Sequence, residues 1–446
     1  MAHFEKGHWI REVSFRLHIC NTVYKGFLMN HRAISKLNRR LLFYTLFLAY
    51  ICAGIISVLP GASLLLLAEN TQVSLAIAGS SFTLSAFGFI IGVLIAGICS
   101  TRLNAKYILM GGLVLMSLAG VITPETHSFL VLLIAQLLKG VGFGLIDVSI
   151  NTIVTLAFQD TLGETLNNVH SSYGIGALAG PLLLSLALQM LHEALWAYLV
   201  GAIAGCVVIF LLIRQTVPEI PTQIDPQRQQ QTSLYRNVFL QPLLWLMALQ
   251  IAFYVGAELG FGSWIVTVLS QSAAISLALA APAATAFFLG LTIGRLLGGQ
   301  VLRRGLLSEN QLLYISILGG FISGIVVAIF PGQIVVSFGA SALVGLFYGP
   351  LFPGIMAMAS RQFVNNIGIV SSVMLVSTGS AAMVIPALMG ILIPIIGINW
   401  VLVFPAFCCL LIIVPLILAN RRQRHPLYLP ANDITINEET PLSTKS

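Results

Sequence analysis

The stretch FGFIIGVLIAGICSTR, residues 87–102, decides the fold because the chain contains its pattern twice. It leads from an apolar run into a basic turn, and 202 positions later the chain reads LGLTIGRLLGGQVLRR, residues 289–304. Four residues match at this one offset: Gly88, Gly92, Gly97 and Arg102 recur as Gly290, Gly294, Gly299 and Arg304. Glycine is common in membrane helices, so each match alone is weak, but the shared register predicts an internal repeat.

The same register extends to neighbouring segments. Gly54 pairs with Gly256 at the offset of 202. Two further glycines, Gly140 and Gly144, recur as Gly345 and Gly349 at an offset of 205, which small changes in loop length would produce. The sequence therefore predicts two halves of one parallel design.

The composition of the chain excludes a soluble protein. Of its 446 residues 57% are hydrophobic and 8% are charged, and the mean hydropathy is +0.95, whereas about a quarter of the residues of a soluble domain are charged. Apolar runs of about 20 residues, each long enough to cross about 30 Å of hydrocarbon, recur from end to end. We expect most of the chain to lie in a lipid bilayer.

Charged, polar and Pro/Gly breaks divide the apolar runs into twelve predicted transmembrane helices. They are expected near residues 41–67, 75–99, 107–123, 129–157, 168–190, 195–213, 240–265, 276–299, 311–330, 333–358, 369–393 and 398–419. The predicted fold is an all-α membrane protein with two six-helix, pseudo-symmetric halves.

The longest polar connection separates these halves. It runs from Arg214 to Asn237 and contains three prolines and three consecutive glutamines, which is typical of a flexible linker. The predicted organisation is a basic cytoplasmic segment (1–40), an N-terminal half (41–213), a cytoplasmic linker (214–238), a C-terminal half (239–419) and a cytoplasmic tail (420–446). Met29 is an alternative start residue, because a short basic segment would suffice before the first helix.

Among the connections between the spans, only alternate ones contain lysine or arginine, which predicts the orientation. Outside the spans, these basic residues lie in the leader, at Arg102 and Lys106, from Arg214 to Arg236, at Arg303 and Arg304, at Arg361, and from Arg421 onward. Because such residues concentrate in cytoplasmic loops, both termini are expected on the cytoplasmic side of the inner (plasma) membrane. The net charge of +7 follows from this topology and calls for no nucleic-acid partner.

Motifs of other functional classes do not occur in the sequence. It has no Gly-x-x-x-x-Gly-Lys-Ser/Thr loop for an ATP-driven pump, and no His-Glu-x-x-His or Gly-x-Ser-x-Gly motif for an enzyme. Five of its six cysteines lie in or beside apolar spans without Cys-x-x-Cys spacing, which predicts packing roles and neither disulfides nor a metal site. We expect no enzymatic activity, no metal and no cofactor, with a proton or sodium ion left open as a coupling ion.

Two motifs resemble those of the major facilitator superfamily. GICSTRLNAK (97–106) resembles its loop between helices 2 and 3, and GALAGP (176–181) resembles its helix 5 motif. The resemblance implies two six-helix halves that bind a solute between them near the membrane midplane. It also implies that the following residues belong to gating loops: Gly97, Arg102, Lys106 and Arg304. Thr101 replaces the acid usual in the loop motif, so the charge relay of that acid does not carry over.

A narrower resemblance concerns helices 4, 5 and 7. GFGLID (142–147), followed by Asn151, Asn167, His170 and GIGA (174–177), resembles bacterial fucose permeases and, more nearly, sodium-dependent glucose transporters, as does YVGAELGFGSW (254–264). It implies a monosaccharide substrate and an acid in helix 4 that acts in proton coupling and sugar recognition. Fucose permeases carry a further acid in helix 1, but residues 41–67 contain none, which leaves proton-coupled, sodium-coupled and uncoupled transport open.

Asp147 is a carboxylate inside an apolar helix, where an unpaired charge is costly. Asn151 follows one helical turn later on the same face, so the pair offers a hydrogen-bonding patch to a sugar hydroxyl. The structural alternative is an ion pair with Lys139, two turns earlier. Lys139 is accordingly the expected intramembrane charge partner, either as a static brace or as part of a proton relay.

Gln250, Tyr254 and Glu258 follow one another at a spacing of four and form a polar stripe on an apolar helix. We expect this stripe to face a cavity between the halves. Trp264 follows it, and an aromatic face beside polar groups suits the apolar face of a sugar ring. The alternative for Trp264 is a place in the interfacial aromatic belt.

His170 and Tyr173 are expected near the start of helix 5, beside the end of helix 4. A histidine titrates near neutral pH and could relay protons, while the alternative is a hydrogen-bonded helix-end group. Arg295 is expected to extend to the cytoplasmic surface or to a neighbouring loop.

Together these features predict a secondary active transporter that moves a small neutral solute, a monosaccharide, by alternating access as a proton or sodium symporter. The alternatives are a drug or metabolite efflux transporter and a non-transporting receptor on the same fold. An anionic substrate would require uncompensated Lys or Arg in the cavity, where only Lys139 is expected. The predicted partners are a sugar and the lipid bilayer, and we expect a monomer.

Overall fold

The computed structural model describes residues 36–100, 102–218, 238–363 and 367–424. The leader up to residue 35 with Met29, Thr101, most of the predicted linker and the tail from residue 425 lie outside the described residues. Every regular element in the described ranges is helical, and 12 helical spans are long and apolar enough to cross a membrane. The predicted all-α, twelve-span fold is confirmed.

The N-terminal half contributes six of these spans. Its helices are α2 (Lys36–Ala62), α3 (Leu64–Asn70), α4 (Leu75–Gly79), α5 (Ser81–Cys99), α6 (Ala105–Glu125), α7 (Phe129–Ala157), α8 (Leu162–Met190) and α9 (Leu195–Ile213). Local chemistry sets their starts: Asn104 accepts a hydrogen bond from the backbone N–H of Lys106 and so caps α6.

The C-terminal half contributes the other six spans. Its helices are α11 (Pro242–Ser272), α12 (Leu277–Ala280), α13 (Pro282–Arg303), α14 (Glu309–Ile329), α15 (Ile334–Tyr348), α16 (Leu351–Gln362), α17 (Ile367–Ile396), α18 (Val403–Leu411) and α19 (Ile413–Arg424). Proline occupies the first position of α11 and α13, where its missing N–H leaves no bond unmade. Ser308 and Gln311 form a capping box at α14.

The repeated glycines mark the closest helix contacts of each half. A Cβ on Gly140 would lie 1.9 Å from the carbonyl oxygen of Ser85, and a Cβ on Gly345 would lie 1.9 Å from that of Phe287. Ser85 and Phe287 are themselves 202 positions apart. The α5–α7 pair and the α13–α15 pair therefore pack in the same way, with backbone against backbone.

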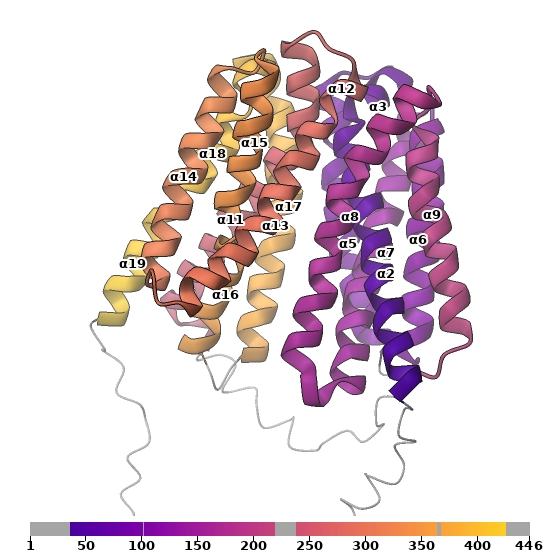
Figure 1. Ribbon diagram of the computed structural model, residues 1–446, viewed down its shortest axis with the longest axis vertical. Helices are drawn as coiled ribbons and strands as arrows, with labels where there is room; N and C mark the ends of the chain where they lie inside the picture. Colours follow the sequence, from indigo (N-terminus) through magenta and orange to yellow (C-terminus); the bar gives the residue numbers. More distant parts are fainter. Residues whose placement is uncertain (1–35, 101, 219–237, 364–366, 425–446) are drawn as a thin grey trace, which may run out of the picture.

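The two halves stand side by side and diverge toward one end of the molecule (Figure 1). We call the end where α2 begins and α19 ends the terminal end, and the opposite end the far end. The hydrogen bonds between described residues of the two halves run from Ser185 Oγ to Ala278 O (2.6 Å), from Thr285 Oγ1 to Leu178 O (3.2 Å) and from Thr83 Oγ1 to Met383 O (2.9 Å). The three donors lie on the far-end side of α8, α13 and α5.

Glycine brings the halves into backbone contact at the far end. A Cβ on Gly61 would lie 2.9 Å from the Cα of Ser263, and a Cβ on Gly390 would lie 3.0 Å from the carbonyl oxygen of Ala76. We call these contacts and the three hydrogen bonds the far-end seal. They close the molecule on that side, while no hydrogen bond between described residues joins the halves near the terminal end.

Large apolar side chains cover the outside of the bundle. Examples from both halves are Leu94, Ile98, Ile203, Ile322 and Ile391, each at least 60% exposed. Soluble proteins rarely expose apolar surface on this scale, whereas lipid tails are its natural environment.

Candidate transport site

Four side chains from three helices of the N-terminal half form a first polar cluster. Tyr50 of α2 donates a hydrogen bond of 2.6 Å from its hydroxyl to Asp147 Oδ1 of α7. His170 Nε2 of α8 lies 2.9 Å from Asn151 Oδ1, and because a carboxamide oxygen only accepts, the imidazole is the donor. The rings of Tyr50 and His170 are 5.0 Å apart, which joins the two hydrogen-bonded pairs. We call these four residues the N cluster.

The N cluster lies within the membrane. Asp147 is ten residues before the end of α7 at Ala157, which places it about 15 Å from that end at about 1.5 Å per residue. His170 is eight residues after the start of α8 at Leu162, or about 12 Å from the same end. Asp147 is partly buried, whereas His170 is exposed. The sequence placed His170 near the start of helix 5, but α8 begins at Leu162, so His170 lies two turns inside the helix, beside Asn151 of the preceding helix.

A second polar cluster lies in the C-terminal half. Glu258 Oε1 of α11 and Arg295 Nη2 of α13 are 3.6 Å apart and form an ion pair. The Glu258 side chain is 15% exposed and that of Arg295 is 37% exposed. We call this pair the C pair. The expectation that Arg295 extends to the surface or a loop was wrong, because a carboxylate on the neighbouring helix is within its reach.

Tyr173 of α8 lies between the N cluster and the C pair. Its ring is 5.5 Å from that of Phe143 on α7. Electrostatic interactions reach it from Glu258 and Arg295 of one half and from Asp147 of the other. His170 likewise interacts electrostatically with Asp147 and with Arg295. The helices that carry His170 and Arg295 also adjoin at the boundary between the halves, because a Cβ on Gly174 of α8 would lie 3.3 Å from Thr292 Oγ1 of α13.

The first two residues of the predicted polar stripe on α11 are enclosed. Gln250 and Tyr254 are fully buried, and the amide nitrogen and oxygen of Gln250 have no hydrogen-bond partner among the described residues. The Tyr254 ring packs against Tyr348 and Phe352, with ring centroids 6.4 and 6.0 Å away. Of the stripe, only Glu258 is open to solvent in this conformation.

Trp264 is also enclosed. It is fully buried, its Nε1 donates a hydrogen bond of 2.9 Å to Pro386 O, and its ring fills the space beside Gly79. This excludes the aromatic belt, in which an indole reaches the membrane surface. In this structure Trp264 packs behind the far-end seal and does not touch the space beside Glu258.

Lys139 is 6% exposed and precedes Asp147 by two turns of α7. The ion pairs among the described residues are Arg39–Asp160, Arg295–Glu258 and Arg361–Glu309. The structural ion pair of Lys139 with Asp147 is therefore not formed, because the two residues are two helical turns apart and Tyr50 already occupies the carboxylate.

The predicted gating residues lie at the terminal end. Lys106 Nζ donates hydrogen bonds to the carbonyl oxygens of Ile213 (3.1 Å) and Gln215 (2.8 Å), where α9 ends. Arg102 and Arg304 are exposed. A Cβ on Gly97 would meet nothing within 4 Å, so this glycine is not required for packing in this conformation.

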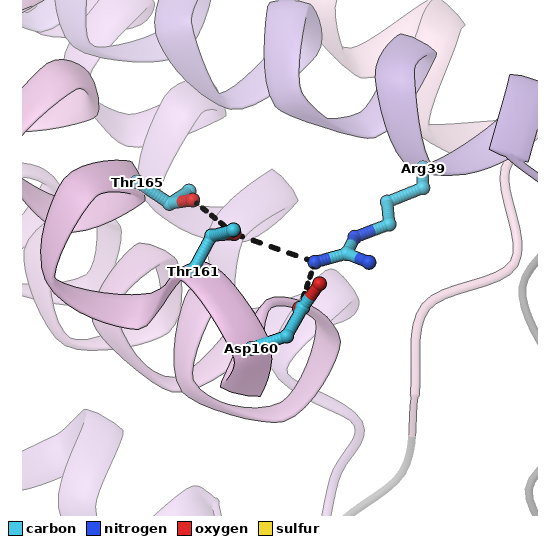
Figure 2. A network of polar contacts seen from close by, with 4 residues as sticks. All are labelled: Arg39, Asp160, Thr161 and Thr165. Atoms are coloured by element: carbon cyan, nitrogen blue, oxygen red, sulfur yellow. Dashed lines mark hydrogen bonds and ion pairs between the residues drawn. The ribbon is translucent and has the colours of Figure 1, made fainter.

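A polar network at the same end ties α2 to the turn between α7 and α8 (Figure 2). Arg39 donates hydrogen bonds to Asp160 Oδ1 and, at 3.4 Å, to Thr161 Oγ1, which lies 3.1 Å from Thr165 Oγ1. The hydrogen bond from Arg39 lowers the pKa of Asp160 below its ordinary value of 3.8. The guanidinium also lies 4.9 Å from the ring centre of Phe158, a cation–π contact.

Known proteins resemble this chain in sequence and in fold. A family model described as Major Facilitator Superfamily matches residues 46–363, well over half of the chain. The chain belongs to the Major Facilitator Superfamily. This facilitator is 24% identical to sodium-dependent glucose transporter 1 of Xenopus laevis over 360 residues, which cover 74% of this chain and 72% of that protein. It is 25% identical to bypass of stop codon protein 6 of Saccharomyces cerevisiae over 365 residues, which cover 72% and 71% of the two chains.

Solved structures share the fold of this facilitator. A mutant of the nucleoside transporter NupG matches with a TM-score of 0.70 at 15% identity, covering 86% of this chain and 99% of that one. The transporter FucP in the outward conformation matches with a TM-score of 0.59 at 18% identity, with the same coverage. These findings confirm the predicted superfamily, and its relatives and fold are those of transporters.

Proposed function

We propose that this facilitator carries a neutral monosaccharide across the inner membrane by alternating access, in symport with a proton or a sodium ion. The observation that carries the proposal is the N cluster close to the C pair. Asn151 and His170 of the N cluster, together with Tyr173, offer neutral donors and acceptors beside the C pair. A hydroxyl-rich solute could exchange hydrogen bonds with such groups without leaving a charge unpaired.

The charges favour a neutral solute over an anion. The guanidinium of Arg295 is compensated by Glu258, and Lys139 is enclosed. The similarity to sodium-dependent glucose transporter 1 points to the same substrate class. The closed far end and the diverging terminal end fit a cytoplasm-facing state, if the terminal end is cytoplasmic as the distribution of Lys and Arg favours.

A thermal-shift screen of the purified protein tests the substrate class. A ligand that binds only the folded state raises the melting temperature, so a panel of sugars is compared with and without sodium and at two pH values. We expect at least one neutral monosaccharide to stabilise the protein. Stabilisation by lipophilic cations or carboxylates, and by no sugar, would point to efflux or organic-anion transport instead.

Asp147→Asn tests the coupling role of the acid. The amide keeps the shape of the side chain and removes the titratable group, so we expect concentrative uptake of the stabilising sugar into proteoliposomes to be lost while exchange persists. Tyr50→Phe, which removes only the hydrogen bond to Asp147, is the matched control and should retain gradient-driven uptake at a reduced rate. Accumulation by Asp147→Asn at the parent level would refute the coupling role.

A further inference from the structure

A groove of about 530 Å³ lies on the outer surface where α11 begins and α19 ends. Apolar side chains supply most of its lining, which is completed by one basic residue: Phe239, Leu240, Pro242, Trp245, Leu246, Leu249, Leu418 and Arg422. The groove is separate from the N cluster and the C pair, because none of its lining residues belongs to either. Transport of a sugar does not account for it.

The position of the groove matches the boundary between hydrocarbon and headgroups. α19 descends to the terminal end, where its last residues carry Arg421 and Arg422, both exposed (Figure 1). Trp245 is 54% exposed, and its Nε1 donates a hydrogen bond of 2.8 Å to Phe239 O. With its polar atom engaged within the protein, the Trp245 ring presents an apolar wall to whatever fills the groove.

The groove carries only positive charge. Arg422 is the sole charged residue of the lining, and it forms no ion pair with any other residue in the described part of the chain. A groove with apolar walls and a cation at the headgroup level complements a molecule that joins a hydrocarbon chain to an anion. A zwitterionic lipid has the same acyl chains, but its headgroup also carries a positive charge, which would lie near Arg422.

We propose that this groove binds one anionic phospholipid, with an acyl chain along Trp245 and Leu249 and the phosphate against Arg422. Arg421 lies next to Arg422 on the exposed end of α19 and adds to the attraction for negative charge. A lipid held there contacts α11, the helix of Glu258, and α19 at once. It would bridge the first and last helices of the C-terminal half.

Native mass spectrometry of the full-length protein tests the charge preference. With equal amounts of phosphatidylglycerol and phosphatidylcholine, we expect at least a fivefold excess of phosphatidylglycerol adducts. Arg422→Gln should reduce the excess to less than twofold. Arg303→Gln, which removes an exposed arginine from the end of α13 outside the groove, is the matched control and should keep the excess.

Tryptophan quenching in nanodiscs tests the location. Phosphatidylglycerol with a brominated acyl chain should quench fluorescence more than brominated phosphatidylcholine, and Trp245→Phe should remove that difference. Equal adduct numbers for the two lipids, or equal loss of the preference in Arg303→Gln, would overturn the proposal. Absence of Trp245-dependent quenching would also overturn it, because no acyl chain would then lie along Trp245.

Discussion

At the residue scale, the two membrane-embedded acids are held in different ways. Asp147 accepts a hydrogen bond from an uncharged phenol, whereas Glu258 is paired with a guanidinium. Asp147 can therefore take up a proton without leaving an unpaired cation behind. Glu258 cannot, because its protonation would leave the charge of Arg295 uncompensated. If the proposed symport uses a proton, we therefore expect Asp147 to carry it.

The C pair gives a prediction about stability and transport. Glu258→Gln or Arg295→Gln alone should destabilise the protein by about 2 kcal/mol, less than the 3–5 kcal/mol of fully buried pairs because Arg295 is partly exposed. The double variant should regain most of the melting temperature yet transport sugar poorly. Arg361→Gln, which breaks the exposed pair with Glu309, is the control and should change stability by less than about 1 kcal/mol. A double variant no more stable than the single ones would contradict an ion pair.

The sequence predicted part of this site for identifiable reasons. Asp147 and Asn151 stood out because polar residues one turn apart are conspicuous in an apolar helix. Tyr50 gave no such signal, since a single tyrosine among apolar residues is also typical of packing. Arg295 was misplaced because its distance to the helix end suggested the surface, and the carboxylate that binds it is on a helix that sequence spacing cannot place.

At the element scale, the glycine contacts predict matching effects in the two halves. Gly140→Ala and Gly345→Ala each place a methyl group against a backbone carbonyl that cannot move without its helix. Such overpacking costs about 1–3 kcal/mol, so both variants should melt several degrees lower, by similar amounts. Gly97→Ala, whose new methyl group meets no neighbour, should melt no lower than the parent. Destabilisation of only one half would show that the halves do not share this contact.

The network around Arg39 predicts a dependence on pH. The pKa of Asp160 is lower in the folded protein than its ordinary value of 3.8, so the stabilising contact is complete above that value and is lost as the pH falls through the folded pKa. Asp160→Asn should lower the melting temperature slightly at pH 7, and the difference from the parent should shrink as the pH falls below 3.8. Glu164→Gln, at an exposed site in the first turn of α8, should show no such convergence.

At the scale of the whole molecule, the fold was predictable and the conformation was not. Twelve apolar spans and the repeated glycines such as Gly88 and Gly290 are local features of the chain, so they can be read in sequence. The end at which the two halves touch depends on contacts of α2 with α11 and of α8 with α12. These helices are far apart in the sequence, so no residue spacing predicts which of their residues meet. For this reason the enclosure of Trp264 beside Gly79 could not be predicted.

The topology gives a prediction for the whole chain. Reporter fusions after Ser446 and within Arg214 to Asn237 should report the cytoplasm, and fusions near Thr126 and His192 should report the outside. Paired reporters that are active on opposite sides of the membrane measure this directly. An external signal from the linker would refute the predicted orientation.

The far-end seal has a consequence for ionic strength. The two ion pairs at the terminal end, Arg39–Asp160 and Arg361–Glu309, each lie within one half, while the seal consists of backbone contacts and uncharged hydrogen bonds. Mobile ions screen exposed charges over a Debye length of about 8 Å at 0.15 M salt, but they have no charge to screen in the seal. We therefore expect salt to weaken contacts within each half and to leave the association of the halves at the far end unchanged.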